Sequence, residues 1–376
     1  MTSENKEDKN EIVLDGHKLM YHQDRVKEWL DGKRIAPITI DMALTQGCNY
    51  KCVYCYGQLQ DNQGYVLNNK VLSRFAGDVE ELGVRGISLI SDGESTCSPH
   101  FYNFIQDIKS RNIDIAVGTN GVLLKEDKLK EMLSALTYLR FNISAGESKR
   151  YAEIMGCKEK DFERIKEIIK ESVKIKKAND LEVTIGLQMV LMPSFKDQII
   201  PLTKLGRDLN VDYLVIKHCS DDEDNSLGVD YSKYDNLVDL LKEAETYSTK
   251  DYLVKAKWSK ILSQGKREYI QCYGPPFMVQ ISGSGLVAPC GMLFNEKYKK
   301  FHIGNIAEKS FKEIWNSDKY WEVMKYIGSE NFDARSDCGH LCLQHKLNEY
   351  LWGLKKEKTR LNPINPEKKP MHINFV

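Results

Sequence analysis

Three cysteines lie close together in a short loop that directly follows a strand-like apolar segment. Cys48, Cys52 and Cys55 have the spacing C-x3-C-x2-C, and the segment before them covers residues 38–45. A 4Fe–4S cluster is normally held by four thiolates, so a local trio leaves one iron open to another ligand. The loop therefore predicts a cluster at which chemistry can take place.

A zinc site, or three unrelated thiols, is the alternative interpretation of the trio. Structural zinc needs a fourth tetrahedral ligand, usually from a nearby C-x2-C or H-x3-H pair, and no such pair follows before Asp92. An aromatic residue, Tyr54, stands just before the last cysteine. With it, the loop resembles that of the radical S-adenosylmethionine (radical SAM) superfamily. The resemblance implies that the open iron binds the amino and carboxylate groups of SAM, and that one electron then splits SAM to give a 5′-deoxyadenosyl radical.

Length and composition favour an intracellular enzyme over a small binding module. The chain has 376 residues, of which 41% are hydrophobic, so it can bury one large core and a smaller attached unit. Residues 1–10 are polar, and no apolar run is long enough to span a bilayer. The 54 basic residues balance 54 acidic ones, which gives no bulk charge to attract nucleic acid or membrane. We expect a cytoplasmic protein without nucleic-acid or membrane partners.

Short apolar runs alternate with amphipathic stretches, as in successive βα units. Six such runs are strand candidates: residues 38–45, 86–91, 114–118, 138–144, 182–191 and 212–217. Six βα units predict an α/β fold, namely a partial, open (β/α)6 barrel whose βα loops line its mouth. The cysteine trio follows the first strand, where this architecture places chemistry.

The resemblance to radical SAM proteins also implies where SAM is held. Asp92-Gly93-Glu94 follows the second strand and resembles the Gly-Gly-Glu motif of the family, with Asp92 in place of the first glycine. The backbone and carboxylate of that motif meet the SAM ammonium group. The resemblance further implies contacts with SAM from Asn120, Asn142 and Ser144 at the ends of the next two strands, and from Gln188 within the fifth strand. It also implies that Tyr54 in the trio loop contacts SAM. Asn120-Gly121 is also a favourable turn dipeptide, which is the alternative for that position.

A second set of cysteines follows the barrel. Cys272 and Cys290 flank a predicted β-hairpin over residues 277–288, and Cys338 and Cys342 follow as C-x3-C. The pattern C-x12-G-x4-C before C-x3-C resembles the auxiliary-cluster domain of SPASM and Twitch radical SAM proteins. Full SPASM domains carry seven cysteines, so four favour the Twitch form with one fully ligated auxiliary 4Fe–4S cluster. A structural zinc held by the same four thiolates is the alternative.

These patterns divide the chain into five parts. We expect an N-terminal extension (1–37), a radical SAM barrel (38–248), a linker (249–271), a small hairpin-plus-helix auxiliary domain (272–345) and a C-terminal tail (346–376). The region around the linker is basic and is a candidate site for phosphate or a nucleotide-linked sugar, with a solvated helix face as the alternative. Its cations are Lys250, Lys255, Lys257, Lys260, Lys266 and Arg267.

Cys219 follows the sixth strand, in a loop expected at the barrel mouth. Its thiol is a candidate catalytic hydrogen donor to a substrate radical, as the lone cysteine of radical SAM epimerases is. The alternative is a small buried hydrophobic residue. The acidic run Asp221 to Asp224 behind it is expected to form a solvated loop. The alternative is that one of its carboxylates holds an amino group or takes a proton from a ketyl radical.

Three functions remain open from the sequence. The leading one is a radical SAM oxidoreductase or epimerase that abstracts hydrogen from a C–H bond of a small polyol, amino sugar or activated sugar, served by an external one-electron donor such as flavodoxin or ferredoxin. The second is modification of a peptide or protein side chain, which the short segment 1–37 does not favour because it is small for a leader-peptide-binding module. The third is a zinc-binding scaffold without catalysis.

Overall fold

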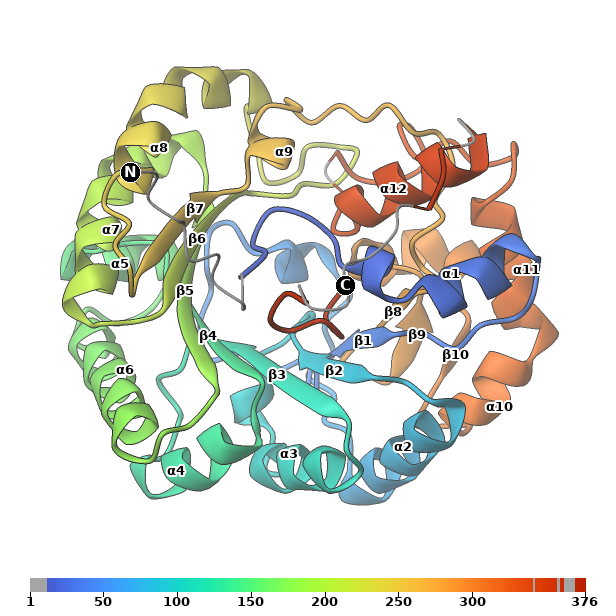
Figure 1. Cartoon of the computed structure of the whole chain (residues 1–376), viewed down its shortest axis with the longest axis horizontal. Helices are drawn as coiled ribbons and strands as arrows, with labels where there is room; N and C mark the ends of the chain where they lie inside the picture. Colours follow the sequence, from blue (N-terminus) through green and yellow to red (C-terminus); the bar gives the residue numbers. More distant parts are fainter. Residues whose placement is uncertain (1–11, 341, 357–358, 362–368) are drawn as a thin grey trace, which may run out of the picture.

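The protein forms one curved, mostly parallel β-sheet with helices along its outer face (Figure 1). The computed structural model describes residues 12–340, 342–356, 359–361 and 369–376. Strands β1 to β7 are neighbours in chain order and all parallel, as in a barrel that is left open on one side. They are β1 Thr39–Met42, β2 Gly86–Leu89, β3 Asp114–Thr119, β4 Tyr138–Asn142, β5 Thr184–Leu191, β6 Tyr213–His218 and β7 Leu253–Ala256. The predicted α/β class is thus confirmed.

The barrel contains one more strand than the six predicted. The additional strand, β7, has only four residues, of which Val254 and Ala256 are buried and Lys255 lies between them. So short a segment with a charged residue in it gives a weak strand signal. It therefore fell within the predicted linker.

The predicted β-hairpin is present, but it belongs to the same sheet as the barrel. Strand β8 (Met278–Ile281) runs antiparallel to β9 (Leu286–Ala288), which pairs with the short β10 (Gly304–Asn305). On its other side β8 pairs in parallel with β1, with Thr39 opposite Met278. The hairpin therefore covers an edge of β1 that would otherwise be unpaired.

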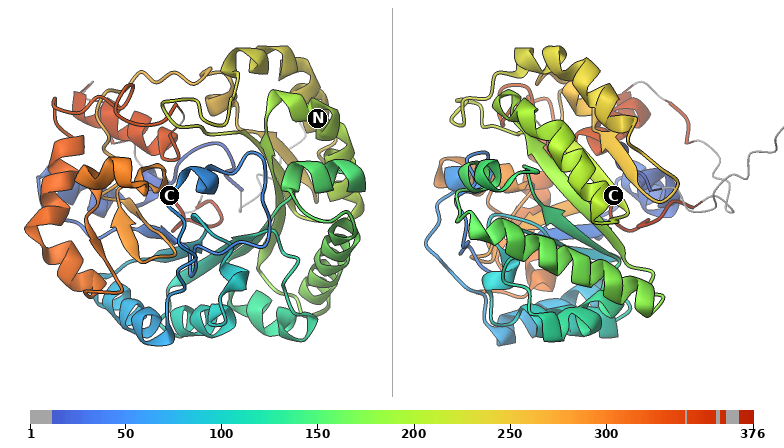
Figure 2. Two further views of the ribbon diagram at one scale, coloured as in Figure 1. Left: turned by 180° about the vertical axis from the view of Figure 1, so that it is seen from behind. Right: turned by 90° about the vertical axis from the view of Figure 1, so that its left-hand side faces the viewer.

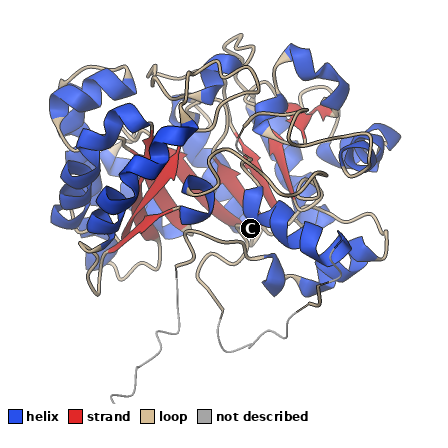
Figure 3. Ribbon diagram, turned by 90° about the horizontal axis from the view of Figure 1, so that it is seen from above, coloured by secondary structure: helices blue, strands red, loops and turns tan. Residues whose placement is uncertain are grey.

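Helices cover the outside of this sheet, and Figures 2 and 3 show the strands enclosed between them. Each helix packs through one apolar stripe; α2, for example, buries Leu72, Phe75 and Val79. No helix of the described residues has both the length and the apolar character needed to cross a membrane. The helices are α1 Gln23–Leu30, α2 Asn69–Leu82, α3 Phe101–Ser110, α4 Glu126–Ala135, α5 Ser148–Met155, α6 Lys160–Ala178, α7 Ile199–Asp208, α8 Val238–Glu245, α9 Trp258–Ile261, α10 Phe311–Asn316, α11 Asp318–Ile327 and α12 His345–Lys356.

The segments at the two ends of the described chain share a core with the start of the auxiliary region. Val26 of α1 and Leu351 of α12 belong to one buried apolar cluster with Phe277 and Met278. The proposed extension and tail therefore pack as parts of one body, although the five boundaries themselves stay predictions.

Residues 372–376 lie inside the ring of strands, at the ends where the strands begin (Figure 1). The Thr39 hydroxyl donates to the Asn374 carbonyl at 2.6 Å, and His372 is 2.7 Å from the Thr184 hydroxyl. Lys18 donates to the Phe375 carbonyl at 2.8 Å. The tail thus covers the end of the barrel opposite the cysteine trio.

Candidate functional site

The trio lies in a loop that is tied to the barrel by backbone hydrogen bonds. The amides of Lys51 and Val53 donate to the carbonyls of Gly156 and Ile154, which stand at the end of α5. Gly156 has a φ of 59°, and a Cβ there would overlap the Lys51 backbone, so glycine is required at this contact. The loop is therefore a fixed element at the mouth of the barrel.

The three thiols of the trio lie near one another: besides desolvation, the charge of Cys55 raises the pKa of both Cys48 and Cys52. Cys48 is exposed, while Cys52 and Cys55 are half-buried. Desolvation raises the pKa of Cys48 to about 12, and it also raises the pKa of Cys52 and Cys55. A thiolate is needed to hold iron, and a bound metal supplies the positive charge that stabilises it. The donor set thus fits the cluster that the spacing predicts.

Gly93 and Glu94 join the second βα loop to the loop of the trio. A Cβ on Gly93 would overlap the Thr45 carbonyl, so only glycine allows this approach. The Glu94 carboxylate accepts from the Thr119 hydroxyl at 2.7 Å and from the Asn120 amide at 2.8 Å. Both side-chain oxygens of Glu94 are engaged, which fixes the ends of β2 and β3 relative to each other.

The other residues predicted to contact SAM lie at adjacent strand ends. The Asn120 side chain donates to Asn49, next to Cys48, at 2.8 Å. Gln188 donates to Asn142 at 2.9 Å across β5 and β4. The Ser144 hydroxyl accepts from the Val190 amide, at 3.1 Å. Their contacts with SAM stay predictions.

Asp92 and Tyr54, which are also predicted to contact SAM, make side-chain hydrogen bonds to other parts of the protein. The Asp92 carboxylate accepts from the Ser282 hydroxyl at 2.6 Å and from the Gly283 amide at 2.9 Å, so it binds the turn of the β8–β9 hairpin. Tyr54 is buried, and its hydroxyl donates to the sulfur of Met155 at 3.1 Å. The link from Asp92 to the hairpin was missed in the sequence, because the two segments are 190 residues apart.

The four later cysteines line one apolar cavity, together with Pro289, Leu293, Ile327 and Phe332. Their sulfurs receive hydrogen bonds: Arg267 donates to Cys338 at 3.0 Å, and the Asn348 amide donates to Cys342 at 3.4 Å. Donors directed at sulfur stabilise thiolates, so the quartet also fits an iron–sulfur cluster. In the part of the chain that the structure describes, no three or more His, Cys, Asp or Glu side chains are arranged to hold a single metal ion.

Cys219 lies beneath the trio loop rather than free at the mouth. Its side chain is fully buried, and its sulfur is 3.4 Å from the Tyr54 carbonyl oxygen. Desolvation raises the pKa of the Cys219 thiol to about 12. Its proposed role as a hydrogen donor stays a prediction.

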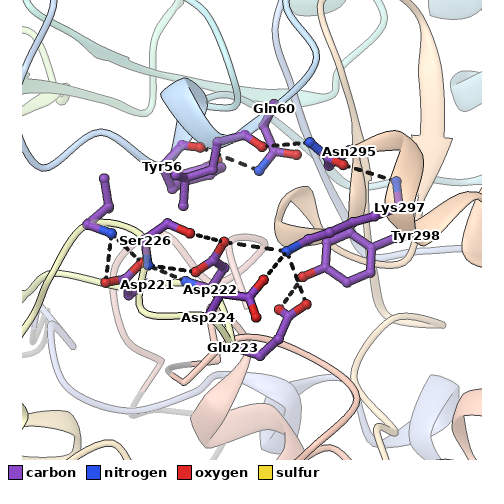
Figure 4. Close-up of polar contacts among 12 residues, drawn as sticks. Tyr56, Gln60, Asp221, Asp222, Glu223, Asp224, Ser226, Asn295, Lys297 and Tyr298 are labelled. Atoms are coloured by element: carbon purple, nitrogen blue, oxygen red, sulfur yellow. Dashed lines mark hydrogen bonds and ion pairs between the residues drawn. The ribbon is translucent and has the colours of Figure 1, made fainter.

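The acidic run behind Cys219 is solvated only in part, which corrects the sequence interpretation: Asp221 and Asp222 are buried, whereas Asp224 is exposed. The fully buried Asp221 carboxylate accepts from the amides of Leu227 and Val229. Figure 4 shows the following three carboxylates gathered around Lys297 and Tyr298 of the auxiliary region. Lys297 is 3.5 Å from Asp222 and 3.1 Å from both Glu223 and Asp224. The amino-acid composition of the run does not indicate these contacts, because Lys297 and Tyr298 are distant in the sequence.

We expect Lys297→Met to loosen this loop, because three carboxylates would then repel one another without a cation. The measurement is hydrogen exchange of residues 220–229, which should become at least about fivefold faster. Lys299→Met is the matched control, because Lys299 pairs only with Glu296 on an exposed surface. Equal hydrogen exchange of residues 220–229 in the two variants would show that Lys297 does not stabilise the acidic loop.

A cavity of about 230 Å³ occupies the interior of the barrel between the two cysteine sets. Tyr56, which follows Cys55, and Leu343, which follows Cys342, both line it. Phe375 and Val376 line it as well, at the end covered by the tail. Inward-facing residues at alternate strand positions form much of the wall: Thr39, Asp41, Ser88, Tyr138, Arg140, Gln188, Tyr213, Val215, Lys217, Met278 and Gln280. The remaining lining residues are Val13, Leu14, Gly16, Lys18, Ile90, Lys257, Lys260 and His372.

Two family models match the two cysteine-bearing regions. Residues 42–203 match the radical SAM superfamily, and residues 272–343 match the iron–sulfur cluster-binding domain called SPASM. The chain belongs to the radical SAM superfamily and carries a SPASM-type auxiliary domain. Its domains imply a 4Fe–4S cluster that binds SAM, SAM itself and an auxiliary 4Fe–4S cluster.

Similar proteins have different activities. A tungsten-containing aldehyde ferredoxin oxidoreductase cofactor-modifying protein of Pyrococcus furiosus is 21% identical over 314 residues, which cover 79% of this chain and 86% of that protein. An AdoMet-dependent heme synthase of Methanosarcina barkeri is 22% identical, with 77% of this chain and 85% of that protein covered. The family is therefore clear, while the relatives do not agree on one reaction.

Among solved structures, the fold resembles that of SuiB of Streptococcus suis bound to S-adenosylmethionine. The TM-score is 0.63 at 17% sequence identity, and the match covers 82% of this chain and 72% of that one. SuiB bound to its precursor peptide SuiA matches with a TM-score of 0.62 at 18% identity, over 83% of this chain and 71% of that one. At this identity, the likeness concerns the fold.

Proposed function

We propose that this radical SAM enzyme abstracts a hydrogen atom from a C–H bond of a small polyol, amino sugar or activated sugar. Cys48, Cys52 and Cys55 would hold the cluster that binds SAM, and the quartet of Cys272, Cys290, Cys338 and Cys342 would hold the auxiliary cluster. When bound, SAM and its cluster supply a one-electron cleavage that yields methionine, 5′-deoxyadenosine and a substrate lacking one hydrogen atom. We further propose that the reaction takes place in the cytoplasm and that a flavodoxin or ferredoxin supplies the electron.

The observation that carries this proposal is the cavity inside the barrel. It extends from Tyr56, beside the trio, to Leu343, beside the quartet. Its volume of about 230 Å³ is below the usual range of ligand pockets, about 300–1,000 Å³, so it favours a small molecule over a peptide.

Oxidation is the outcome that the surroundings of the cavity favour. Cys219 is buried against Tyr54 and is not among the residues that line the cavity, so its thiol is poorly placed to return a hydrogen atom. For oxidation, the carbinol carbon would give up a hydrogen atom to become a carbon-centred radical. That radical would then lose its hydroxyl proton to a base and one electron to an iron–sulfur acceptor, which leaves a ketone. Asp41 is the proposed base, because burial raises the pKa of its carboxyl to about 6.

Cys219→Ala is therefore expected to leave the product unchanged. With the substrate in deuterated water, both the wild type and the variant should release a ketone that lacks two hydrogen atoms and carries no carbon-bound solvent deuterium introduced by the enzyme. Mass spectrometry of the product provides the measurement. A wild-type product of unchanged composition with one solvent deuterium, lost in Cys219→Ala, would instead establish epimerisation through this thiol.

Peptide modification is the second candidate, and the likeness to SuiB bound to a precursor peptide favours it. The two candidates differ in the size of the molecule that stimulates SAM cleavage. Reconstituted enzyme with SAM and dithionite should form 5′-deoxyadenosine faster when the small-molecule fraction of a cell extract is added than when the peptide fraction is added. Stimulation by the peptide fraction alone would overturn the small-molecule proposal.

A further inference from the structure

Five cationic side chains line the cavity inside the barrel; one of them, Lys18, comes from the N-terminal segment and donates to the Phe375 carbonyl at 2.8 Å. Arg140 lies in the middle of β4, Lys217 near the end of β6, and Lys257 and Lys260 directly after β7. Strands β4, β6 and β7 belong to the last four strands of the sheet, β4-β5-β6-β7, with β7 at its open edge (Figure 1). The cations therefore converge on one space from separate parts of the chain.

These cations are poorly neutralised by the protein. Among the described residues, Arg140, Lys217 and Lys257 have no carboxylate within the distance of an ion pair, 4.0 Å. The Arg140 Nε atom is buried without a hydrogen-bond partner. Lys260 differs, because its amine donates to the Cys342 carbonyl at 2.8 Å.

One acidic side chain, Asp41, is among the residues that line the cavity. Its carboxylate accepts from Gln280 at 3.1 Å rather than pairing with a cation within 4.0 Å. One acidic side chain against five basic ones leaves the side chains of the cavity with an excess of positive charge whenever the lysines are protonated.

Such a group of like charges is unfavourable without a counter-ion. Desolvation, together with the charges of Arg140 and Lys260, lowers the pKa of Lys217 to about 7. Desolvation and the charges of Lys260, Lys217 and Arg140 likewise hold the pKa of Lys257 well below its usual range. A bound anion would reverse this effect, because it stabilises the protonated amines.

We propose that these cations bind a phosphate or diphosphate group of the substrate. This inference rests on the proposed function, and it restricts the substrate to phosphorylated or nucleotide-linked sugars. The guanidinium of Arg140 matches two phosphate oxygens at once, and Lys217 and Lys257 supply further donors and charge. A phosphate ester carries more than one negative charge, which suits this excess better than a single carboxylate does.

Binding of small anions to the reconstituted, SAM-saturated protein tests the proposal by calorimetry, without any turnover. Inorganic phosphate and UDP are expected to bind, with uridine and succinate at least about tenfold weaker. Arg140→Gln and Lys257→Gln should each weaken the binding of phosphate and UDP by about tenfold or more. Lys255→Gln is the matched control, because Lys255 lies on the same strand end but pairs with Glu245 at 3.4 Å.

Two further measurements separate loss of the site from loss of the fold. The melting temperature of Lys257→Gln without anion should equal or exceed that of the wild type, because the variant removes one of several mutually repelling cations. Its affinity for SAM should be unchanged. Equal binding of uridine and UDP, absence of phosphate binding, or wild-type affinity in both variants would overturn the proposal. Because no step of this test requires SAM cleavage, its result is independent of whether the proposed reaction occurs.

Discussion

Replacement of Cys48, Cys52 and Cys55 with Ala is expected to abolish SAM cleavage and halve the iron content. The trio and the quartet form two separate sites, so the wild type should hold about eight irons and the triple variant about four. Iron and sulfide are counted after anaerobic reconstitution, and 5′-deoxyadenosine is measured with dithionite as reductant. The quartet should stay loaded because its residues are unchanged.

Cys157→Ala is the control for this experiment. Cys157 follows Gly156 next to the trio loop, and its sulfur lies 3.7 Å from the Lys158 carbonyl oxygen. Iron content and SAM cleavage should remain at the wild-type level. A wild type with only about four irons, or a triple variant that still cleaves SAM, would contradict the account.

Cys290→Ala is expected to remove the auxiliary cluster and destabilise the region around the β8–β9 hairpin. A thiolate site contributes folding free energy through its metal, and Cys290 lines the same cavity as the other three cysteines. The variant should lose about four irons, melt several degrees lower and retain binding of SAM in the barrel. Calorimetric melting and iron analysis provide the measurements.

The effect should extend to the barrel, because the hairpin pairs with β1 and its turn binds Asp92. Hydrogen exchange in β8 and β1 should therefore increase together in Cys290→Ala. A variant as stable and as active as the wild type would show that the quartet is not a cluster site.

The barrel and the cysteine sets could be predicted because their signals are local. Each of the first six strands is a short apolar run, and each cysteine set shows a recognisable spacing. The hairpin could also be predicted from its local sequence. Its pairing with β1 could not, because the apolar pattern of a strand does not indicate which other strand it pairs with. The acidic loop was misread for a similar reason, since its partner Lys297 lies 73 residues away from Asp224.

The cationic cavity could be predicted from the sequence only in part. Arg140 stands in Tyr-Leu-Arg-Phe-Asn and Lys217 in Leu-Val-Ile-Lys-His, so each is a charged residue within an apolar strand. A charged side chain at such a position has to face an interior cavity or pair with an opposite charge. The sequence therefore indicated that these two residues have a special environment. That these two side chains and Lys257 share one cavity became visible only in the folded structure.

The most direct test of the central claim is product analysis with a panel of related sugars. The reconstituted enzyme, SAM and dithionite are incubated with neutral sugars, the corresponding sugar phosphates and nucleotide-linked sugars, and 5′-deoxyadenosine and sugar masses are recorded together. We predict that one phosphorylated or nucleotide-linked sugar raises 5′-deoxyadenosine formation and is recovered lighter by two hydrogen atoms. Stimulation by neutral sugars to the same extent, or by peptides alone, would contradict the account.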